Sequence, residues 1–370
     1  MNKIAIASVL KPVNDPRAFA KLGLSLCETN KYHLNIIGFF AKNVINFKNV
    51  KFTPICNAYR LHPKRLLASK NFLRELKSYC PDLVVVTTYE LLPAAIWGKK
   101  RYRYKLIYDV QENYSFNILD HRSLPFGLRQ LAAYLVRAIE KRASPYIDHF
   151  IYAEQSYVNE LAFAGDYTVL QNKFQGPVYQ VSPYRLDHKS RFHFIISGTI
   201  TPSYGIEEAM DWFSHLSRQY EGSQLTIIGH VTLPSFRQKI EKTAITIPGI
   251  LLKISSKPVA SSEILSALED ADIILLPYRQ KASIQYKIPT KLFEVLAMGK
   301  PVIHSKNAQW SEMIQRYPAG SGIDFTETSS APAQFETFLS QTFYLTPPSP
   351  DLTWNSVSDQ WLTLVDKLLK

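Results

Sequence analysis

Short apolar runs alternate with longer amphipathic segments along almost the whole chain. In the first half the apolar runs include KIAIASVL (3–10), HLNIIGFF (33–40) and DLVVVTT (82–88), and segments with helical periodicity lie between them. Strands that are apolar throughout are buried on both faces, which requires helices on both sides of a parallel sheet. The pattern therefore predicts a doubly wound α/β domain.

The alternation stops at QGPVYQVSPYRLDHKS (175–190), which contains two prolines and no periodicity. It restarts at FHFIISG (192–198) and continues to the prolines of LTPPSP (345–350). We therefore predict two Rossmann-like domains of similar size, followed by a helix that packs back toward the first domain. Their predicted bounds are 1–178 for the first domain, 179–190 for the linker, 191–350 for the second domain and 351–370 for the helix.

The composition is that of a folded protein, because 46% of the 370 residues are hydrophobic and 20% are charged. No apolar run reaches the ~18–20 residues that span a bilayer. The first strand runs on to Lys11 and Asp15 without a small-residue cleavage site, so we expect no signal peptide. Cys27, Cys56 and Cys80 are scattered and odd in number. We expect a cytoplasmic protein with no disulfide framework and no bound metal.

The formal net charge is +12, and the whole excess lies in residues 1–180, whereas residues 181–370 are balanced. Such asymmetry indicates an acidic partner for the first domain: nucleic acid, an anionic membrane face or an anionic substrate. No zinc-finger spacing, helix-turn-helix signature or RNA-binding aromatic motif accompanies the charge. A membrane surface is therefore favoured over nucleic acid.

Two predicted helices concentrate this charge. The basic residues expected to face the membrane are Lys70, Arg74 and Lys77 on one helix, and Arg122, Arg129, Arg137 and Lys141 on the other. At ~100° per residue, an apolar side of the second helix faces away from its basic residues, and we expect this side to pack inward. It comprises Leu128, Leu131, Leu135, Ala138 and Ile139. The alternative for each helix is an ordinary solvated face.

The segment IPTKLFEVLAMGKPVI (288–303) carries the sharpest local signal. Thr290 begins a predicted helix at the carboxyl end of a strand, where backbone N–H groups and the positive end of the helix dipole favour a phosphate. Lys287 and Lys291 add positive charge. Glu294, one turn later, can accept hydrogen bonds from a vicinal diol such as a ribose. The alternative is an ordinary capped helix with a solvated glutamate.

This segment resembles the donor-nucleotide motif of the retaining glycosyltransferases of the GT-B fold, family 4-like, in which K-x-x-E precedes a small-residue A-x-G-x-P-V-I. Other segments resemble the same family in the same order: DPR (15–17), IYDVQENY (107–114), VLQNKF (169–174) and FIISGTITPSYGIEEAM (194–210). The resemblance covers nearly the whole chain. It implies an α/β GT-B fold, in which two doubly wound parallel-sheet domains face each other across a cleft.

The chain departs from the family pattern at three places. Tyr286 stands eight positions before Glu294, where family members commonly carry a first glutamate. Thr199 and its neighbours stand where an Arg/Lys pair usually holds the diphosphate. Gln111 stands where many members have a histidine. The positive charge for the diphosphate is therefore expected from later loops of the second domain.

The resemblance implies which residues form the sites. The donor nucleotide is expected at Gly198, Thr199, Arg279, Lys287, Thr290, Lys291 and Glu294. The acceptor is expected at Asp15 and Arg17, and catalysis at Gln111, Glu112 and Lys291, with no cofactor beyond the nucleotide-sugar donor. A turn with a helix cap is the alternative for Asp15 and Arg17, and a solvated loop residue is the alternative for Glu112.

We therefore expect a hexosyltransferase, retaining by its family, that moves a sugar from a nucleotide-diphospho-sugar to a glycan or lipid-linked acceptor in cell-surface polysaccharide synthesis. We expect it to be cytoplasmic, peripheral on the inner face of the cytoplasmic membrane, and to bind no nucleic acid. Two alternatives remain: a non-catalytic scaffold protein with this fold, and a sugar-nucleotide epimerase, which would leave the charge of the first half without a use. His230 and His304 follow apolar strands and are interpreted as strand-end histidines with satisfied hydrogen bonds.

Overall fold

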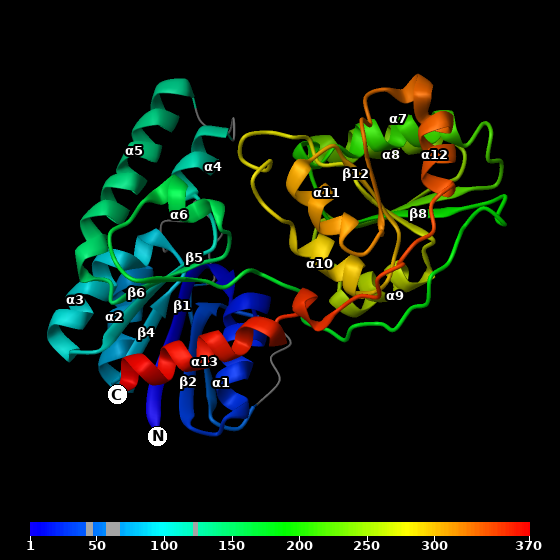
Figure 1. Cartoon of the computed structure of the whole chain (residues 1–370). Helices are drawn as coiled ribbons and strands as arrows, with labels where there is room; N and C mark the ends of the chain where they lie inside the picture. The colour runs from blue at the N-terminus through cyan, green and yellow to red at the C-terminus, as the bar shows by residue number, and fades with distance from the viewer. Residues whose placement is uncertain (42–46, 57–66, 121–124) are drawn as a thin grey trace. The chain divides into compact units, whose positions relative to one another are not determined.

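The computed structural model describes residues 1–41, 47–56, 67–120 and 125–370. These residues form two compact units (Figure 1). The first comprises Met1–Gln175 and Trp354–Lys370, and the second comprises Gly176–Thr353. The expected linker residues belong to the second unit, where the N–H of Tyr179 donates to the carbonyl of Ala297 at 2.8 Å.

The described part of the first unit contains a seven-stranded sheet in the order β3-β2-β1-β4-β5-β6-β7, and every pairing is parallel. Its strands are β1 (Asn2–Pro12), β2 (Tyr32–Phe39), β3 (Val50–Cys56), β4 (Leu83–Val86), β5 (Lys105–Val110), β6 (His149–Tyr152) and β7 (Tyr167–Val169). Its helices are η1 (Pro16–Gly23), α1 (Leu24–Glu28), α2 (Ala68–Tyr79), η3 (Tyr89–Leu91), α3 (Leu92–Tyr102), α4 (Tyr114–Asp120), α5 (Phe126–Ala143), η4 (Ser144–Tyr146), α6 (Ser156–Leu161) and α13 (Asn355–Leu369).

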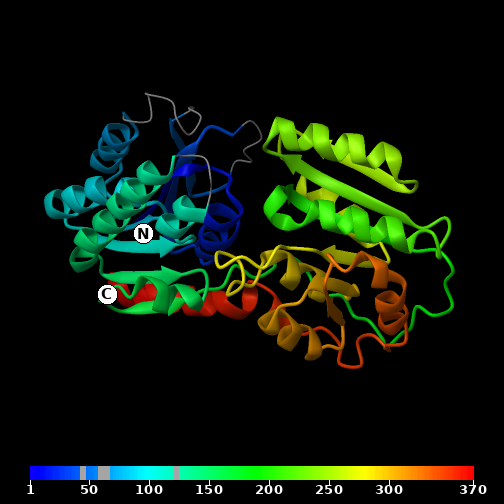
Figure 2. The ribbon, with the colours of Figure 1, turned by 90° about the horizontal axis from the view of Figure 1, so that it is seen from above.

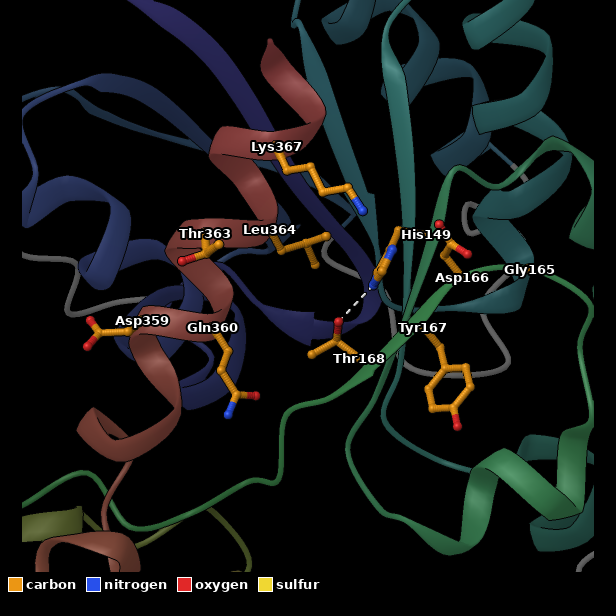
Figure 3. A pocket seen from close by; sticks show the side chains of 10 residues that line it. All are labelled: His149, Gly165, Asp166, Tyr167, Thr168, Asp359, Gln360, Thr363, Leu364 and Lys367. Carbon is orange, nitrogen blue, oxygen red and sulfur yellow. Dashed lines mark hydrogen bonds between the residues drawn. The ribbon is translucent and has the colours of Figure 1, made fainter.

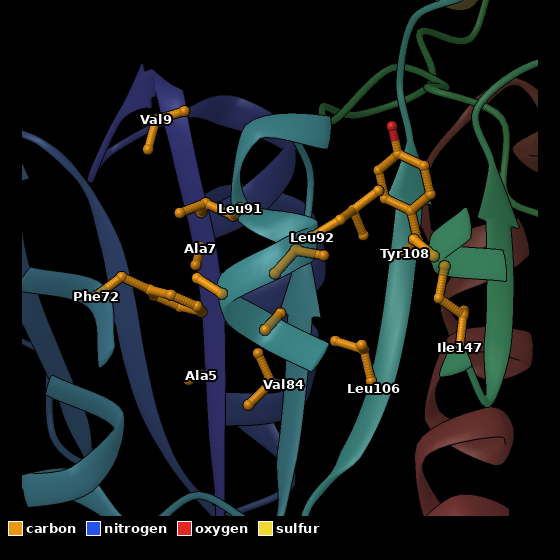
Figure 4. Close-up of a cluster of buried hydrophobic side chains, with 14 of the residues drawn as sticks. Ala5, Ala7, Val9, Phe72, Val84, Leu91, Leu92, Leu106, Tyr108 and Ile147 are labelled. Atoms are coloured by element: carbon orange, nitrogen blue, oxygen red, sulfur yellow. The ribbon is translucent and has the colours of Figure 1, made fainter. Parts of the chain in front are cut away.

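Successive residues of β1 point to opposite faces of this sheet, and both faces are covered. Ala5 and Ala7 pack with Phe72 of α2 and with the start of α3, as Figure 4 shows. Ile4 and Ile6 pack on the other face, under η1, α1 and α13. Burial of both faces explains why the strand sequences are apolar throughout.

The closing helix α13 belongs to the first unit, as the views of Figures 1 and 2 show. Trp361 is fully buried, and its indole N–H donates to the carbonyl of Leu22 at 3.0 Å. The indole N–H of Trp354 donates to the hydroxyl of Ser25 at 2.9 Å. Two tryptophans therefore anchor the end of the chain on η1 and α1.

The described part of the second unit contains a six-stranded parallel sheet in the order β10-β9-β8-β11-β12-β13. Its strands are β8 (His193–Ile200), β9 (Gln224–Val231), β10 (Ile250–Ser255), β11 (Ile273–Leu276), β12 (Val302–Ser305) and β13 (Gly320–Ile323). Its helices are η5 (Pro202–Tyr204), α7 (Ile206–Leu216), α8 (Pro234–Thr246), α9 (Ser261–Asp270), α10 (Thr290–Ala297), α11 (Ala308–Gln315), η6 (Thr328–Ser330), α12 (Ala331–Leu339) and η7 (Pro350–Leu352).

None of the helices in the described ranges combines the length and the apolar character that crossing a bilayer requires.

Candidate functional site

The end of β8 and the loop that leads from it to α7 have a backbone path that depends on glycine. Gly198 has φ +108°, and a Cβ placed on it would meet no atom within 4 Å. Gly205 has φ +64°, and a Cβ there would lie 1.8 Å from the carbonyl oxygen of Pro277. Only glycine fits this close approach. The loop is thereby held against the carboxyl end of β11, with open space over Gly198.

The loop from β11 to α10 is anchored on the β8 side. The N–H of Arg279 donates to the carbonyl of Ser203 at 3.1 Å. The rings of Tyr204 and Tyr278 are stacked with centroids 4.4 Å apart. These contacts join the two loops that follow the adjacent strands β8 and β11, at the sheet edge where parallel α/β sheets bind ligands.

The same loop is anchored on the other side by α11. The indole N–H of Trp310, a fully buried residue, donates to the carbonyl of Lys287 at 2.7 Å. The side-chain amide of Asn307 donates to the carbonyl of Gln285 at 2.9 Å. The sequence reasoning missed these two anchors, although Asn307 is a recognisable helix cap, accepting from the N–H of Trp310.

Two charged residues of α10 pair with each other. The Nζ of Lys291 lies 2.5 Å from Oε2 of Glu294, and their side chains are 14% and 12% exposed. Thr290 is the first residue of the helix, and the preceding N-cap residue, Pro289, makes no side-chain capping hydrogen bond. A helix start of this kind presents backbone N–H groups and a positive dipole to an anion. The ammonium group of Lys291 retains further protons that can be donated to a ligand.

Arg279 is oriented by two glutamates at the start of α7. Its Nε donates to Oε1 of Glu208 at 2.6 Å, and its Nη2 lies 4.0 Å from Oε2 of Glu207. Glu207 also pairs with Lys239. The guanidinium group is 40% exposed, so it is held in place while it remains accessible. Its position beside Ser203 puts a cation next to the loop that lacks the Arg/Lys pair.

The predicted donor residues therefore lie along one edge of the second sheet. Gly198 and Thr199 are in β8, Arg279 and Lys287 are in the loop after β11, and Thr290, Lys291 and Glu294 are in α10. Their assignment to a donor nucleotide remains a prediction.

Asp15 and Arg17, the predicted acceptor residues, have partners inside the first unit. Oδ1 of Asp15 accepts from the N–H of Arg17 at 3.0 Å and thereby caps η1. The guanidinium of Arg17, 4% exposed, donates to both carboxylate oxygens of Asp109 and to the carbonyl of Leu170. These contacts hold η1 to β5, as the helix-cap alternative expects, and the acceptor role of Asp15 and Arg17 remains a prediction.

Gln111 and Glu112 follow β5, and both are partly exposed. The amide of Gln111 donates to Oδ2 of Asp109 at 2.8 Å. Oε2 of Glu112 accepts from the amide of Asn117 at 3.0 Å, and its Oε1 lies 4.0 Å from Nζ of Lys11. Glu112 is partly exposed to solvent, and its role in catalysis remains a prediction.

The buried hydroxyls of Thr87 and Thr88, next to the end of β4, have no hydrogen-bond partner among the described residues. The sequence reasoning did not single these two residues out.

The predicted membrane-facing residues divide into three groups. Lys70, Arg74 and Lys77 are exposed on α2, and Lys141 is exposed on α5. Arg129 and Arg137 donate inward, to the carbonyls of Leu119 at 3.1 Å and Glu160 at 2.8 Å. Arg122 lies outside the described residues. Leu128, Leu131 and Leu135, expected to pack inward, are exposed, which corrects the prediction for them, whereas Ala138 and Ile139 are partly buried.

Two hollows lie apart from the predicted donor residues. The larger, about 780 Å³, lies between α13 and the strands β6 and β7 (Figure 3). Its residue His149 begins β6, so the hollow lies at the amino ends of the strands, opposite the edge expected to bind ligands. Burial lowers the pKa of His149, whose Nε2 is 2.8 Å from the hydroxyl of Thr168.

The smaller hollow, about 520 Å³, is lined by β12, β13 and α11 and includes His304. Its Nδ1 lies 2.8 Å from the carbonyl oxygen of Ser305, whereas the buried Nε2 has no partner among the residues the structure describes. Burial lowers the pKa of His304 to about 4. His304 therefore lies at a strand end, as interpreted, but its Nε2 is not satisfied by the described residues. In the described ranges, no group of three or more His, Cys, Asp or Glu side chains is placed to hold a metal ion.

Residues 191–335 match the family model described as glycosyl transferases group 1. These residues form a group 1 glycosyl transferase domain. The match covers most of the second unit, including all the predicted donor residues. The match confirms the predicted glycosyltransferase activity. It also confirms the family resemblance that was inferred from residues 288–303. A search of curated proteins finds no match to the chain.

The solved structures similar to this chain support the predicted GT-B fold. HepE from Anabaena, in a complex with UDP and glucose, is 13% identical over 99% of this chain and 100% of its own, with a TM-score of 0.64. WaaG, a glycosyltransferase involved in lipopolysaccharide biosynthesis, is 12% identical over 98% and 95%, with a TM-score of 0.63. Sucrose-phosphate synthase from Thermosynechococcus elongatus is 14% identical over 100% and 99%, with a TM-score of 0.59. At these identities the likeness shows the fold alone.

Proposed function

We propose that this protein transfers a sugar from a nucleotide-diphospho-sugar to a glycan or lipid-linked acceptor in cell-surface polysaccharide synthesis, with retention of anomeric configuration. The observation that carries the proposal is the paired Lys291 and Glu294 in the first turn of α10, inside the matched domain. HepE is solved with UDP and glucose, which makes UDP the first nucleotide to test.

The donor's diphosphate is held in this proposal by the amino end of α10 together with Lys291 and Lys287. Arg279 supplies the charge that the β8 loop lacks, because its guanidinium is already oriented by Glu208. Glu294 accepts hydrogen bonds from the ribose hydroxyls. Fixed cations and N–H groups of this kind stabilise the negative charge that develops on the departing diphosphate.

The acceptor is held in this proposal by the first unit, near Gln111 and Glu112. Glu112 is the candidate to receive a proton from the acceptor hydroxyl, since its carboxylate is partly exposed at the carboxyl end of β5. A peripheral position on the inner face of the cytoplasmic membrane brings the enzyme to a lipid-linked acceptor. The excess of positive charge in residues 1–180 supports this position.

A thermal-shift screen of nucleoside diphosphates tests the donor assignment. A ligand present at a hundred times its dissociation constant stabilises the folded state by ~2.7 kcal/mol. We expect at least one nucleoside diphosphate to raise Tm, and the corresponding nucleoside to raise it less. Release of that nucleotide from its sugar conjugate in the presence of acceptor then measures transfer. A screen in which no nucleotide shifts Tm would overturn the proposal.

The second candidate function is a non-catalytic scaffold protein with the same fold. Two observations favour it: Tyr286 stands where a first glutamate is common, and Thr199 and its neighbours stand where an Arg/Lys pair usually holds the diphosphate. Calorimetry with the same nucleotides discriminates between the two functions, because a scaffold without a donor site binds none of them.

A further inference from the structure

Helix α5 exposes an apolar ridge to solvent. Five large apolar side chains between residues 126 and 135 are each more than half exposed: Phe126, Leu128, Leu131, Tyr134 and Leu135. A contiguous apolar surface of this kind on a soluble unit marks an interaction site. Figure 1 shows α5 at the margin of the first unit.

The inward side of α5 explains why the leucines face outward. Ala133 and Val136 are buried, and so is Glu140, whose Oε1 accepts from the hydroxyl of Tyr108 at 2.8 Å. Arg137 satisfies the carbonyl of Glu160 near the end of α6. The polar groups beneath α5, the hydroxyl of Tyr108 and the carbonyl of Glu160, therefore favour polar and small residues on the inward side of the helix. Positions 128, 131 and 135, spaced three and four apart, consequently share the opposite side.

The charge around the ridge indicates which partner covers it. Lys141 and Arg142 are exposed on the last turn of the same helix. The excess of twelve positive charges lies in residues 1–180. A second copy of the chain would bring an equally basic surface against this one, whereas an anionic bilayer is complementary both to the cations and to the apolar side chains.

We propose that the ridge formed by Leu128, Leu131, Tyr134 and Leu135 inserts into the headgroup region of an anionic membrane. Lys141 and Arg142 pair with lipid phosphates at the margin of the inserted surface. This inference rests on the proposed membrane association and assigns its contact surface. In this inference the helix binds mainly by inserting an apolar face, and not by charge alone. Salt weakens such binding much less than it weakens a purely electrostatic contact.

Co-sedimentation of the full chain with vesicles tests the inference. The vesicles are phosphatidylcholine alone, or phosphatidylcholine with phosphatidylglycerol, each at low and high salt. We expect binding to the anionic vesicles that persists in part at high salt. The variant Leu131→Ser with Leu135→Ser is expected to lose about tenfold or more in affinity, from the apolar area withdrawn from the bilayer. Both leucines are exposed, so the fold is expected to survive, and thermal melting checks this.

Matched control variants separate the possible outcomes. Ile245→Ser with Leu345→Ser removes two apolar side chains of the second unit that are more exposed than Leu131 and Leu135, and this variant is expected to bind as the wild type does. Lys70→Ala with Lys77→Ala is expected to weaken binding at low salt only.

Wild-type affinity in the Leu131 and Leu135 variant overturns the inference and leaves membrane association standing. A wild type that binds no vesicle overturns both. A dimer in light scattering that the ridge variant abolishes, without vesicle binding, assigns the ridge to a second copy instead. Donor turnover, measured without vesicles, tests the glycosyltransferase proposal independently.

Discussion

Lys291 and Glu294 form an ion pair across the first turn of α10, with Nζ and Oε2 2.5 Å apart. The pair orients both groups before a ligand arrives. It also means that removing either residue leaves the other without its partner. The two residues therefore act together on any donor at this edge of the sheet.

Replacing Glu294 by alanine is expected to abolish nucleotide-sugar turnover with little loss of fold. In the proposal the carboxylate accepts hydrogen bonds from the ribose hydroxyls. Because the side chains of the pair are only 14% and 12% exposed, leaving Lys291 unpaired is expected to cost on the order of 1–3 kcal/mol of stability, which a folded domain can tolerate. Turnover and the unfolding midpoint are measured together. Glu312→Ala is the control, because Glu312 forms an exposed pair with Arg316 one turn away on another helix. Wild-type turnover in the Glu294 variant would remove this residue from the site.

Replacing Arg279 by alanine is expected to weaken the binding of a nucleoside diphosphate more than that of the nucleoside, because in the proposal its guanidinium contacts the phosphates alone. Loss of one charge-assisted hydrogen bond corresponds to about 1.5–3 kcal/mol, or roughly ten- to a hundredfold in affinity. Calorimetry with both ligands gives the comparison. Arg237→Ala is the control, since Arg237 is similarly exposed and also paired with a glutamate. Equal losses for nucleoside and nucleoside diphosphate would exclude a phosphate contact.

Replacing Arg17 by alanine is expected to destabilise the first unit by about 3–5 kcal/mol, because it leaves the fully buried carboxylate of Asp109 without its cation. Urea unfolding measures the loss. The double variant Arg17→Met with Asp109→Leu is expected to recover much of the stability, since it removes both charges together. An Arg17 variant that keeps its stability but loses acceptor affinity would assign Arg17 to the acceptor site instead.

The parts of the fold that the sequence predicted are those determined by local pattern. The strands β1, β4 and β8 are apolar throughout because helices cover both faces of their sheets, and such runs can be read directly. The start of α10 was found for a similar reason: its lysine, its glutamate and the following Gly299 stand at spacings set by one helix.

What the sequence did not predict depends on residues far apart in the chain. Arg17 and Asp109 are 92 positions apart, so their pairing becomes visible only when β1 and β5 are in place. The inward side of α5 was misassigned because a leucine stripe ordinarily packs against the core. Here the carbonyls of Leu119 and Glu160, and the hydroxyl of Tyr108, provide partners for polar residues of α5 instead.

Glu140 makes the stability of the first unit depend on pH. Burial raises the pKa of Glu140 from 4.5 to about 7, although the hydrogen bond from Tyr108 and the charge of Arg137 lower it. The folded state therefore binds a proton more tightly than the unfolded chain does. Stability is highest below pH 4.5 as far as this group is concerned, falls as the pH rises to about 7, and is constant above that value.

The variant Glu140→Gln is expected to remove this dependence. Each pKa unit corresponds to 1.36 kcal/mol, so the variant is expected to be more stable than the wild type at pH 8 by on the order of 1–3 kcal/mol, and equally stable near pH 4.5. Urea unfolding at the two pH values measures both differences. The glutamine keeps an oxygen that can accept the hydrogen bond from Tyr108. A change in the free energy of unfolding is therefore not expected to come from the loss of that hydrogen bond. A variant that is less stable at pH 8 would show that the ionised carboxylate beside Arg137 stabilises α5.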